Sequence, residues 1–438
     1  MNVRILGDRT DELSLAVGLL PVGLLAGYLA VTDLVMALFI VFLPLLLFLF
    51  LRPAWGVALA VGLLPVLRPL LGSEGGAAIV SPSDAVLAVA VAGLVPLWLL
   101  REEWSRRLVA LRPLLPFVLP YVGWLFVVLA AHLSGRTAFK TMTALEITVL
   151  PLVLGACVMD RRRLGYALYG FVGASCVLSV LWIANVGASF AGNKNAAGQY
   201  IALGLLVAVL LARRGVRGLL PVPLLLVGLL FTASRGAIVG AAFGAVALLA
   251  LRGLGSWRRT AAATAFLSVT IIVGYNAVPV SLQARVAAIL QANADDTSSD
   301  LSEVQASTNY NLKIRKQYRQ DALDLVAANP LLGVGTGNYL TGAGTVAQSA
   351  DPHNFVLRAA AEGGIPNAVA FLTFVVGSTV VLLRRLGSSP WAGPALALQT
   401  CSLIHGLVDV YFIRGIPVLG WFFVGLALNP QLIRENDA

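Results

Sequence analysis

The sequence predicts an all-α polytopic integral membrane protein of about 14 transmembrane helices, within a range of roughly 12 to 14. Apolar residues make up 58% of the 438 residues, charged residues only 12%, and the mean hydropathy is +0.87. A soluble domain carries about twice that share of charge. Apolar runs of roughly 17 to 20 residues, each long enough to cross about 30 Å of hydrocarbon as a helix, recur along nearly the whole chain. Open strands are excluded because they would expose unpaired backbone groups to lipid.

The apolar runs define the predicted helices in order along the chain. Their approximate bounds are 13–31, 34–51, 54–71, 83–100, 114–132, 141–159, 165–184, 196–212, 218–233, 236–251, 260–277, 355–383, 391–409 and 412–429. The run at 54–71 and the pair that meets near residue 234 are short, so re-entrant or half-length elements are the alternative there. We expect three regions: transmembrane helices 1 to 11 in 1–277, an outer-face loop in 278–354, and helices 12 to 14 in 355–438.

Arginine residues fall in every second connection and set the predicted orientation. They are Arg52, Arg101, Arg106, Arg107, Arg112, Arg161, Arg162, Arg163, Arg213, Arg214, Arg217, Arg252, Arg258, Arg259, Arg384 and Arg385. Connections rich in Lys and Arg stay in the cytoplasm, so both termini are expected on the cytoplasmic side. This topology also explains the net charge of +10 and indicates no nucleic-acid partner.

The outer connections carry cations too, and the topology gives no reason for these. Arg136, Lys140, Lys194 and Arg235 lie in three short outer connections. Snorkelling toward lipid headgroups is one explanation, above all for the first two. Small residues flank Lys194 and Arg235, so backbones can approach closely there and leave room for a ligand.

Arg235 is the strongest candidate for binding a diphosphate. It follows two hydroxyl side chains at a predicted helix start, where an arginine fork and free N–H groups suit phosphate oxygens. Lys194 can supply a second cation. The amides of Asn193 and Asn195 beside it can bind sugar hydroxyls.

The long outer segment contains two predicted amphipathic helices, at 278–293 and 309–330, which an acidic stretch at 294–303 separates. We expect both helices to lie on the membrane surface as a lid. Cations and aromatic residues gather on the second helix: Lys313, Arg315, Lys316, Arg319, Tyr310 and Tyr318. A solvated charged face is the ordinary interpretation. The alternative is a groove for a glycan phosphate, with Arg315 and Arg319 on the phosphate and Tyr318 on the glycan.

His353 is the candidate catalytic residue. It precedes the predicted helix at 355–383 on the outer face and is one of three histidines in the chain. A histidine in this position can instead belong to an N-terminal helix cap with Asp351 and Asn354. Its ring could act as a general base, orient the acceptor or bind phosphate, and Asn354 is a candidate contact for the glycan or acceptor.

Two further pairs are predicted to be structural. Arg358 and Glu362 lie four residues apart in one helix, so an ion pair is expected. His405 and Asp409 have the same spacing near the outer end of the helix at 391–409, where we expect a buried hydrogen-bonded pair. Two ligands without a third do not make a zinc site, so no metal is expected.

Four segments together resemble the O-antigen ligase and O-antigen polymerase superfamily. "RKQYRQDALDLVAANPLLGVGTGNYL" (315–340) and "DPHNFVLRAAAEGGIPN" (351–367) are similar to its Arg-containing helix, Asn-Pro-Leu-x-Gly-x-Gly turn, His-Asn pair and Glu-x-Gly-Ile element. "TASRGA" (232–237) resembles its Ser-Arg-Gly element, and "AGNKNAAG" (191–198) resembles its Asn-rich outer loop. The sequence departs from the pattern at Lys194, where an arginine would serve equally well, and in its Glu-Gly-Gly-Ile-Pro element.

The resemblance implies a metal-independent, inverting glycosyltransferase without a cofactor, acting at the outer face of the bacterial inner membrane. Its donor would be a glycan on undecaprenyl diphosphate. Its acceptor would be a hydroxyl of a growing polysaccharide, lipid A core, another glycan or a protein. Arg235, with Lys194 or a cation around Arg315, would stabilise the leaving diphosphate, and His353 would take the proton. Both a ligase and a polymerase fit this pattern.

Two other classes of function fit parts of the sequence. A secondary transporter is indicated by charges within predicted helices or at their ends, namely Asp33, Arg68, Asp84 and Glu146. The lack of paired halves with matching broken helices, and the long segment 278–354, favour the glycosyltransferase. A protein that binds a lipid-linked glycan without transferring it is the other alternative, and such a protein would tolerate loss of His353.

Overall fold

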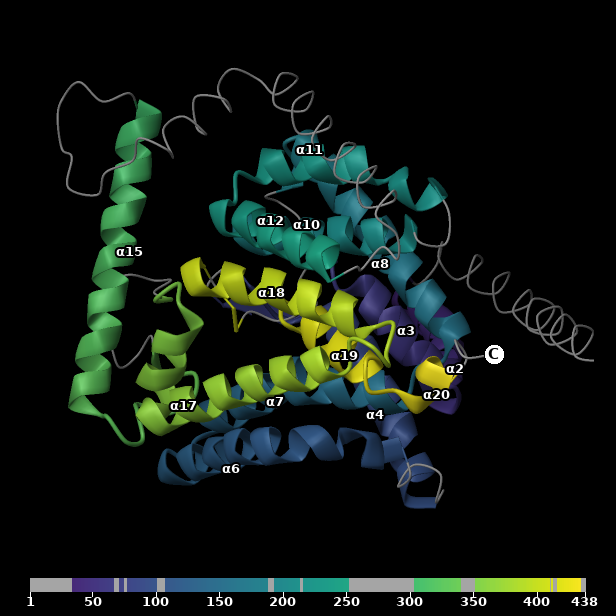
Figure 1. The fold of residues 1–438 in the computed structure, drawn as a ribbon, viewed down its shortest axis with the longest axis horizontal. Coiled ribbons are helices and arrows are strands. Elements are labelled where there is room, and N and C mark those ends of the chain that lie inside the picture. The colour runs from purple at the N-terminus through teal and green to yellow at the C-terminus, as the bar shows by residue number, and fades with distance from the viewer. Residues whose placement is uncertain are drawn as a thin grey trace, which may run out of the picture.

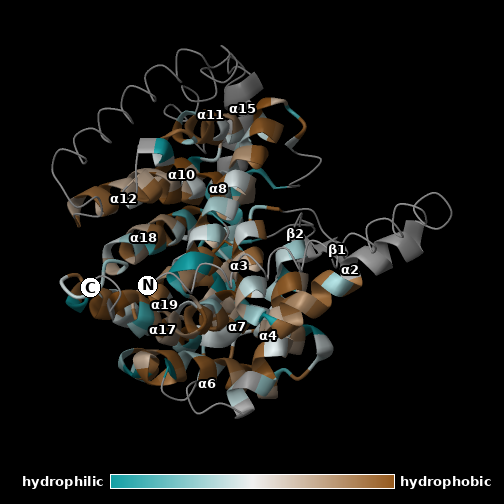
Figure 2. Ribbon diagram, turned by 90° about the vertical axis from the view of Figure 1, so that its right-hand side faces the viewer, coloured by the Kyte–Doolittle hydropathy of each residue, from teal (hydrophilic) through white to brown (hydrophobic). Residues whose placement is uncertain are grey.

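The computed structural model describes residues 34–66, 71–74, 77–100, 107–187, 193–212, 216–251, 303–339, 351–409, 411–412 and 416–434. The predicted helices at 13–31 and 260–277 and the amphipathic helix at 278–293 lie outside these ranges. So do Asp33 and Arg68. Within the described ranges the protein is a bundle of helices (Figure 1) with one two-stranded hairpin (Figure 2).

The first described elements are α2 (Leu34–Leu51) and α3 (Pro53–Leu63), which bend by 116° at their junction. At 54–71 the structure agrees with the half-length alternative and not with one full helix, because α3 ends at Leu63, two residues before a proline that cannot donate a helical hydrogen bond. An antiparallel hairpin follows, formed by β1 (Leu71–Glu74) and β2 (Ala77–Val80). The two strands pair with each other. The hairpin is a small departure from the all-helical fold that the sequence predicts.

Four long elements follow: α4 (Pro82–Leu100), α6 (Leu115–Ala131) after the 3-10 turn η1 (Val109–Leu114), α7 (Gly135–Cys157) and α8 (Arg161–Ile183). Helix α7 begins before its predicted start at residue 141. The reason is a helix cap, in which the Ser134 hydroxyl accepts a hydrogen bond from the Thr137 N–H. Arg136 and Lys140 therefore lie in the first turns of α7 and not in a loop.

The centre of the bundle is α10 (Lys194–Leu211), which packs against α8, α11, α12 and α18. Helix α11 (Val222–Thr232) follows the 3-10 turn η3 (Val216–Leu219) and is shorter than predicted. It ends at Ala233, whose left-handed backbone (φ 50°) turns the chain directly into α12 (Arg235–Ala250). This tight turn sets the N-terminus of α12 beside the N-terminal end of α10, because Gly198 packs against Ser234.

The C-terminal part contains α15 (Glu303–Ala328), α17 (Phe355–Arg384), α18 (Ala392–Val408), α19 (Val418–Leu426) and α20 (Pro430–Arg434). Helix α15 starts earlier than the predicted 309, and the predicted helix at 412–429 is reduced to α19, which starts after Pro417. Figure 1 shows α15 running across one end of the bundle, transverse to α17 and α18.

Aromatic residues form the core of the bundle near the end that α15 crosses. The Tyr411 ring lies 5.0 Å from that of Phe355 and 5.9 Å from that of Phe371, measured between centroids. The indole N–H of Trp421 donates to the Tyr411 hydroxyl at 3.1 Å. Each aromatic pair contributes about 0.5–1.5 kcal/mol beyond the area that it buries. The start of α17 and the segment after α18 are thus held together by packing.

Five described helices are long and apolar enough to cross a membrane: 109–131, 135–157, 161–183, 194–211 and 355–384. The bent pair of α2 and α3 makes a sixth if it counts as one span. Hydrophobic residues predominate along α6 (Figure 2), where the outward side chains of Leu119 and Phe126 are 59% and 46% exposed. Such faces suit contact with lipid. The chain is a multi-pass membrane protein, and the count of 12 to 14 spans and their orientation stay predictions.

Candidate active site

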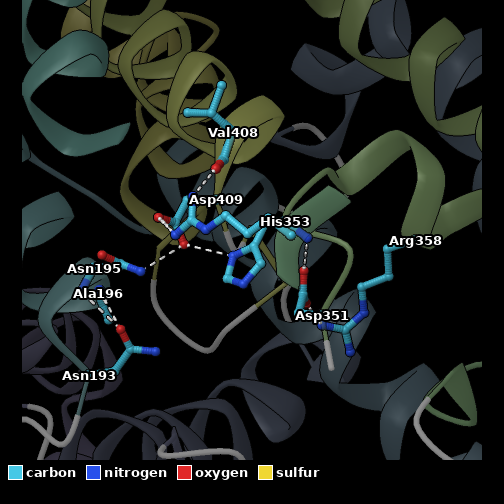
Figure 3. A network of polar contacts seen from close by, with 9 residues as sticks. Asn193, Asn195, Ala196, Asp351, His353, Arg358, Val408 and Asp409 are labelled. Carbon is cyan, nitrogen blue, oxygen red and sulfur yellow. Dashed lines mark hydrogen bonds and ion pairs between the residues drawn. The ribbon is translucent and has the colours of Figure 1, made fainter. Parts of the chain in front are cut away.

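The carboxylate of Asp409, at the C-terminal end of α18, joins four segments of the chain. It is 2% exposed and accepts hydrogen bonds from Asn195 Nδ2 at 3.0 Å, His353 Nδ1 at 3.1 Å and Arg315 Nη2 at 3.1 Å. Figure 3 shows the side chains of Asn195 and His353 converging on it. Burial by itself raises the pKa of Asp409, but the hydrogen bond from His353 and the charges of His405 and Arg315 outweigh it and hold the pKa below its ordinary value. Asp409 is therefore ionised.

Arg315 reaches the site from α15. Besides its ion pair with Asp409, its Nη1 donates to the carbonyl oxygen of Val408 at 2.9 Å. This places a guanidinium at the negative end of the α18 dipole, a favourable position for a cation. Arg315, predicted to bind diphosphate, thus holds α15 against the bundle in this structure.

His353 lies in the short segment before α17, with Asn354 as the helix cap that accepts from the N–H groups of Val356 and Leu357. A carboxylate can only accept, so the Nδ1 of His353 carries the proton toward Asp409 when the ring is neutral, and Nε2 keeps its lone pair. The Tyr318 ring from α15 stacks on His353 with centroids 6.5 Å apart. The acid, the histidine and the stacked tyrosine together fix the direction of Nε2.

The N-termini of three described helices, α10, α12 and α17, face Asp409. Asn193 caps α10 by accepting from the N–H groups of Asn195 and Ala196. At the start of α12, Gly236 has no side chain, and a Cβ there would lie 3.3 Å from the Asp409 Cβ. Arg235, the first residue of α12, lies close enough to Asp409 and Arg315 for both charges to act on it. Helix N-termini carry partial positive charge, so this end of the bundle is suited to an anion.

The other predicted site residues lie on α15 and at the starts of α10 and α17. Lys194 begins α10 directly beside Asn195, and Arg319 is exposed on α15 one turn after Arg315. Asn193 and Asn354 cap helices, Asn354 Nδ2 also donates to the Leu407 carbonyl oxygen at 3.3 Å, and the amide of Asn195 binds Asp409. Sugar binding by these residues stays a prediction.

The expected hydrogen bond between His405 and Asp409 is not present. Both ring nitrogens of His405 are buried without a hydrogen bond to Asp409, and Nδ1 lies over the backbone of Gly236. Asp409 is the C-cap of α18, with extended backbone, and its side chain turns toward His353 instead. The ion pair of Arg358 and Glu362 is present, with Nε to Oε1 at 3.2 Å.

The glycine-rich turn after α15 binds to a break in α17. Gly364 leaves the helical conformation (φ 78°, ψ 172°), which frees the carbonyls of Ala361 and Glu362. They accept instead from the N–H groups of Val334 and Gly335 at 3.0 and 2.8 Å. The turn is thus an ordered partner of α17, since buried carbonyls need hydrogen-bond donors.

Sequence reasoning missed two acidic residues around His353. Asp409 is 56 residues away in the chain, and its spacing from His405 suggested a different partner. Asp351 was considered only as a helix cap, whereas it accepts from the His353 N–H at 2.8 Å and pairs with Arg358. The nearby Asp-Pro-His sequence was a signal for the second contact.

Comparison with known proteins gives one family match. Residues 220–372 match the family model described as O-antigen ligase. This stretch contains Arg235, Arg315 and His353, whereas Asn195 and Asp409 lie outside it. No curated protein matches the chain. The match at 220–372 supports the resemblance of this part of the chain to the O-antigen ligase superfamily.

Proposed function

We propose that the protein transfers a glycan from undecaprenyl diphosphate to an acceptor hydroxyl at the outer face of the bacterial inner membrane. The acceptor is a growing polysaccharide, lipid A core or another glycan, and transfer inverts the anomeric carbon without a metal ion. The observation that carries the proposal is the hydrogen bond of His353 Nδ1 to the buried, ionised Asp409, which leaves Nε2 as a proton acceptor among cationic groups.

In the proposed reaction the acceptor oxygen attacks the anomeric carbon from the face opposite the diphosphate. Nε2 of His353 takes the hydroxyl proton, which activates a weak nucleophile. The bond between the anomeric carbon and the diphosphate oxygen breaks, and its electron pair leaves with the diphosphate. Asp409 stays ionised and stabilises the imidazolium that forms, as the acid of a histidine-containing triad does.

The negative charge that grows on the leaving diphosphate needs stabilisation. Arg235 supplies a guanidinium at the N-terminus of α12, and its fork can contact two phosphate oxygens. Lys194 begins the neighbouring helix, and Arg319 is exposed on α15 one turn after Arg315. Fixed cations of this kind stabilise phosphate leaving groups in sites that exclude water.

The proposal is tested by transfer from a lipid-linked glycan in nanodiscs, with released undecaprenyl diphosphate and glycosylated acceptor as products. His353→Ala is expected to lower kcat by about 100-fold or more while donor binding is retained. The control is Ser388→Ala, at an exposed position in the turn between α17 and α18, which should keep wild-type kcat. A wild type that binds the donor but releases no undecaprenyl diphosphate with any acceptor would refute a transferase and support a binding protein.

A further inference from the structure

His353 has an uncommon backbone conformation for a residue with a side chain. Its φ is +49°, in the left-handed region that glycine favours. Such a residue keeps this conformation only when the surrounding structure holds it there. The conformation decides where the imidazole points, so the groups that hold the backbone also aim the ring.

The group that holds the backbone is the carboxylate of Asp351. Its Oδ1 accepts from the His353 N–H at 2.8 Å, which forms an Asx turn across the intervening proline (Figure 3). This contact is not needed to cap α17, because Asn354 already accepts from the first N–H groups of that helix. The Asp351 contact therefore acts on His353 itself.

Asp351 is held in turn by two connected ion pairs, Asp351 with Arg358 and Arg358 with Glu362. Its Oδ2 accepts from Arg358 Nη1, and Arg358 Nε donates to Glu362 Oε1 at 3.2 Å. The three side chains are only 15%, 21% and 10% exposed. Ion pairs with this much burial are geometrically restrained, since separating either partner leaves a poorly solvated charge.

The segment that follows α15 contacts these ion pairs at Glu362. The Glu362 carbonyl accepts from the Gly335 N–H at 2.8 Å, and the Tyr339 hydroxyl in the same turn donates to the Tyr318 carbonyl oxygen at 2.8 Å. Tyr318 stacks on the His353 ring. Two sets of contacts thus act on His353. Asp351, held by Arg358 of α17, binds its backbone, and Tyr318 of α15 packs on its ring.

We propose that Asp351 is a positioning residue for His353, and this inference rests on the proposed function. Arg358, which Glu362 holds in place, fixes the carboxylate of Asp351. Asp351 in turn keeps His353 in the left-handed conformation that brings Nδ1 to Asp409 and leaves Nε2 facing the acceptor. Asp351 itself does not contact substrate.

The kinetic test compares Asp351→Ala with Asp351→Asn. The alanine variant loses the acceptor for the His353 N–H, and kcat should fall by about 100-fold with the KM for the donor nearly unchanged. The asparagine variant keeps a side-chain oxygen at that position and should recover kcat to within about tenfold of wild type. Asp324→Ala, which removes an exposed acid of α15, is the control.

A second readout does not depend on turnover. With ¹⁵N-labelled histidine at a pH of about 8.5, where an ordinary histidine is neutral, His353 should appear as the Nδ1–H tautomer in wild type. His353→Ala assigns the signal among the three histidines of the chain. Asp351→Ala should give a mixture of tautomers, because the contact with Asp409 is loosened, and Asp351→Asn should restore the wild-type tautomer.

Two results would overturn the inference: unchanged kcat and tautomer in Asp351→Ala, or an equal loss in the alanine and asparagine variants. If Asp351→Ala does not fold by its thermal unfolding curve, Asp351→Asn and Arg358→Lys decide by the same readouts. Arg358→Lys keeps the positive charge but lacks the guanidinium that pairs with Asp351 and Glu362 at the same time. The ratio of His353 tautomers should therefore shift in this variant. A wild type without transferase activity refutes the proposed function alone, since the tautomer measurement still decides the role of Asp351.

Discussion

At the scale of single residues, the site depends on one buried acid that binds groups from distant segments. Asp409 binds Asn195, Arg315 and His353 through the same carboxylate. Its charge is compensated on several sides, which accounts for its low pKa despite burial. An ionised acid on Nδ1 selects the tautomer in which Nε2 is a base, the orientation that proton abstraction needs.

Asp409→Asn should therefore lower kcat more than it changes the KM for the donor. The amide can donate to Nδ1 and so favours the wrong tautomer, for which a loss of about 10²- to 10⁴-fold is expected. Steady-state transfer assays in nanodiscs measure the effect, with Asp324→Asn as the matched control on α15. A variant with wild-type kcat would exclude Asp409 from the reaction.

The same substitution should reveal a pH-dependent contribution to stability. The pKa of Asp409 is lower in the folded protein than the ordinary value of about 3.9. The ionised group therefore stabilises the fold at pH values above about 4, and this contribution is lost as the pH falls from there toward the folded pKa. We expect Asp409→Asn to cost on the order of 3 kcal/mol at pH 7. The difference in Tm from wild type should shrink below about pH 4, and a constant difference from pH 7 to 3 would contradict this.

Arg235 is expected to act on the leaving group. Arg235→Ala should lower kcat/KM by about 10²- to 10³-fold, because a fixed cation no longer meets the developing charge. Arg235→Lys keeps the charge without the fork and should recover part of the activity. Arg217→Ala, an exposed arginine before α11, should leave transfer unchanged. Unaltered kcat/KM in Arg235→Ala would show that the diphosphate binds elsewhere.

At the scale of elements, the break in α17 allows one helix to serve two purposes. The first turns carry the ion pairs beside His353, and the remainder is an apolar span. The prolyl and glycyl residues at 363–366 interrupt the helix, and the turn at 333–335 supplies the missing donors. The position of His353 thus depends on the docking of a loop against a helix.

Gly364→Ala should destabilise the protein strongly. Its φ of +78° is unfavourable for alanine, and a Cβ would lie 2.0 Å from the carbonyl oxygen of Leu331. Strain and overpacking together suggest a loss on the order of 3 kcal/mol. Thermal unfolding in detergent measures it, and Gly123→Ala on α6, where a Cβ meets open space, should have little effect. Equal Tm values for the two variants would contradict the docking.

At the scale of the whole molecule, α15 lies across the end of the bundle at which the site forms (Figure 1). The predicted orientation puts this end on the outer face, and the turn between α17 and α18 in the cytoplasm. In a chain whose three native cysteines are replaced, Gln317→Cys on α15 should react with an impermeant maleimide in intact spheroplasts. Ser388→Cys, exposed in that turn, should react only after permeabilisation. The reverse pattern would invert the orientation and the proposed site of transfer.

Metal independence is also a property of the whole enzyme. The proposed reaction assigns the leaving-group charge to Arg235, Lys194 and Arg319. Excess EDTA should therefore leave kcat within about twofold of the untreated enzyme, because these side chains are always charged at neutral pH. Loss of transfer with EDTA, and its recovery on adding a divalent cation, would contradict the proposed mechanism.

Composition and local pattern by themselves determined that the chain is a helical membrane protein, and motif residues pointed to Arg235 and His353. These features are local, since hydrophobic runs and short motifs depend on neighbours in the chain. Only the tertiary structure decided that Asp409 pairs with His353 and not with His405, and that Asp351 holds the His353 backbone. Such pairings depend on which helix ends meet in space and on how the backbone turns. A four-residue spacing identifies only neighbours on one helix, so it predicts neither of these.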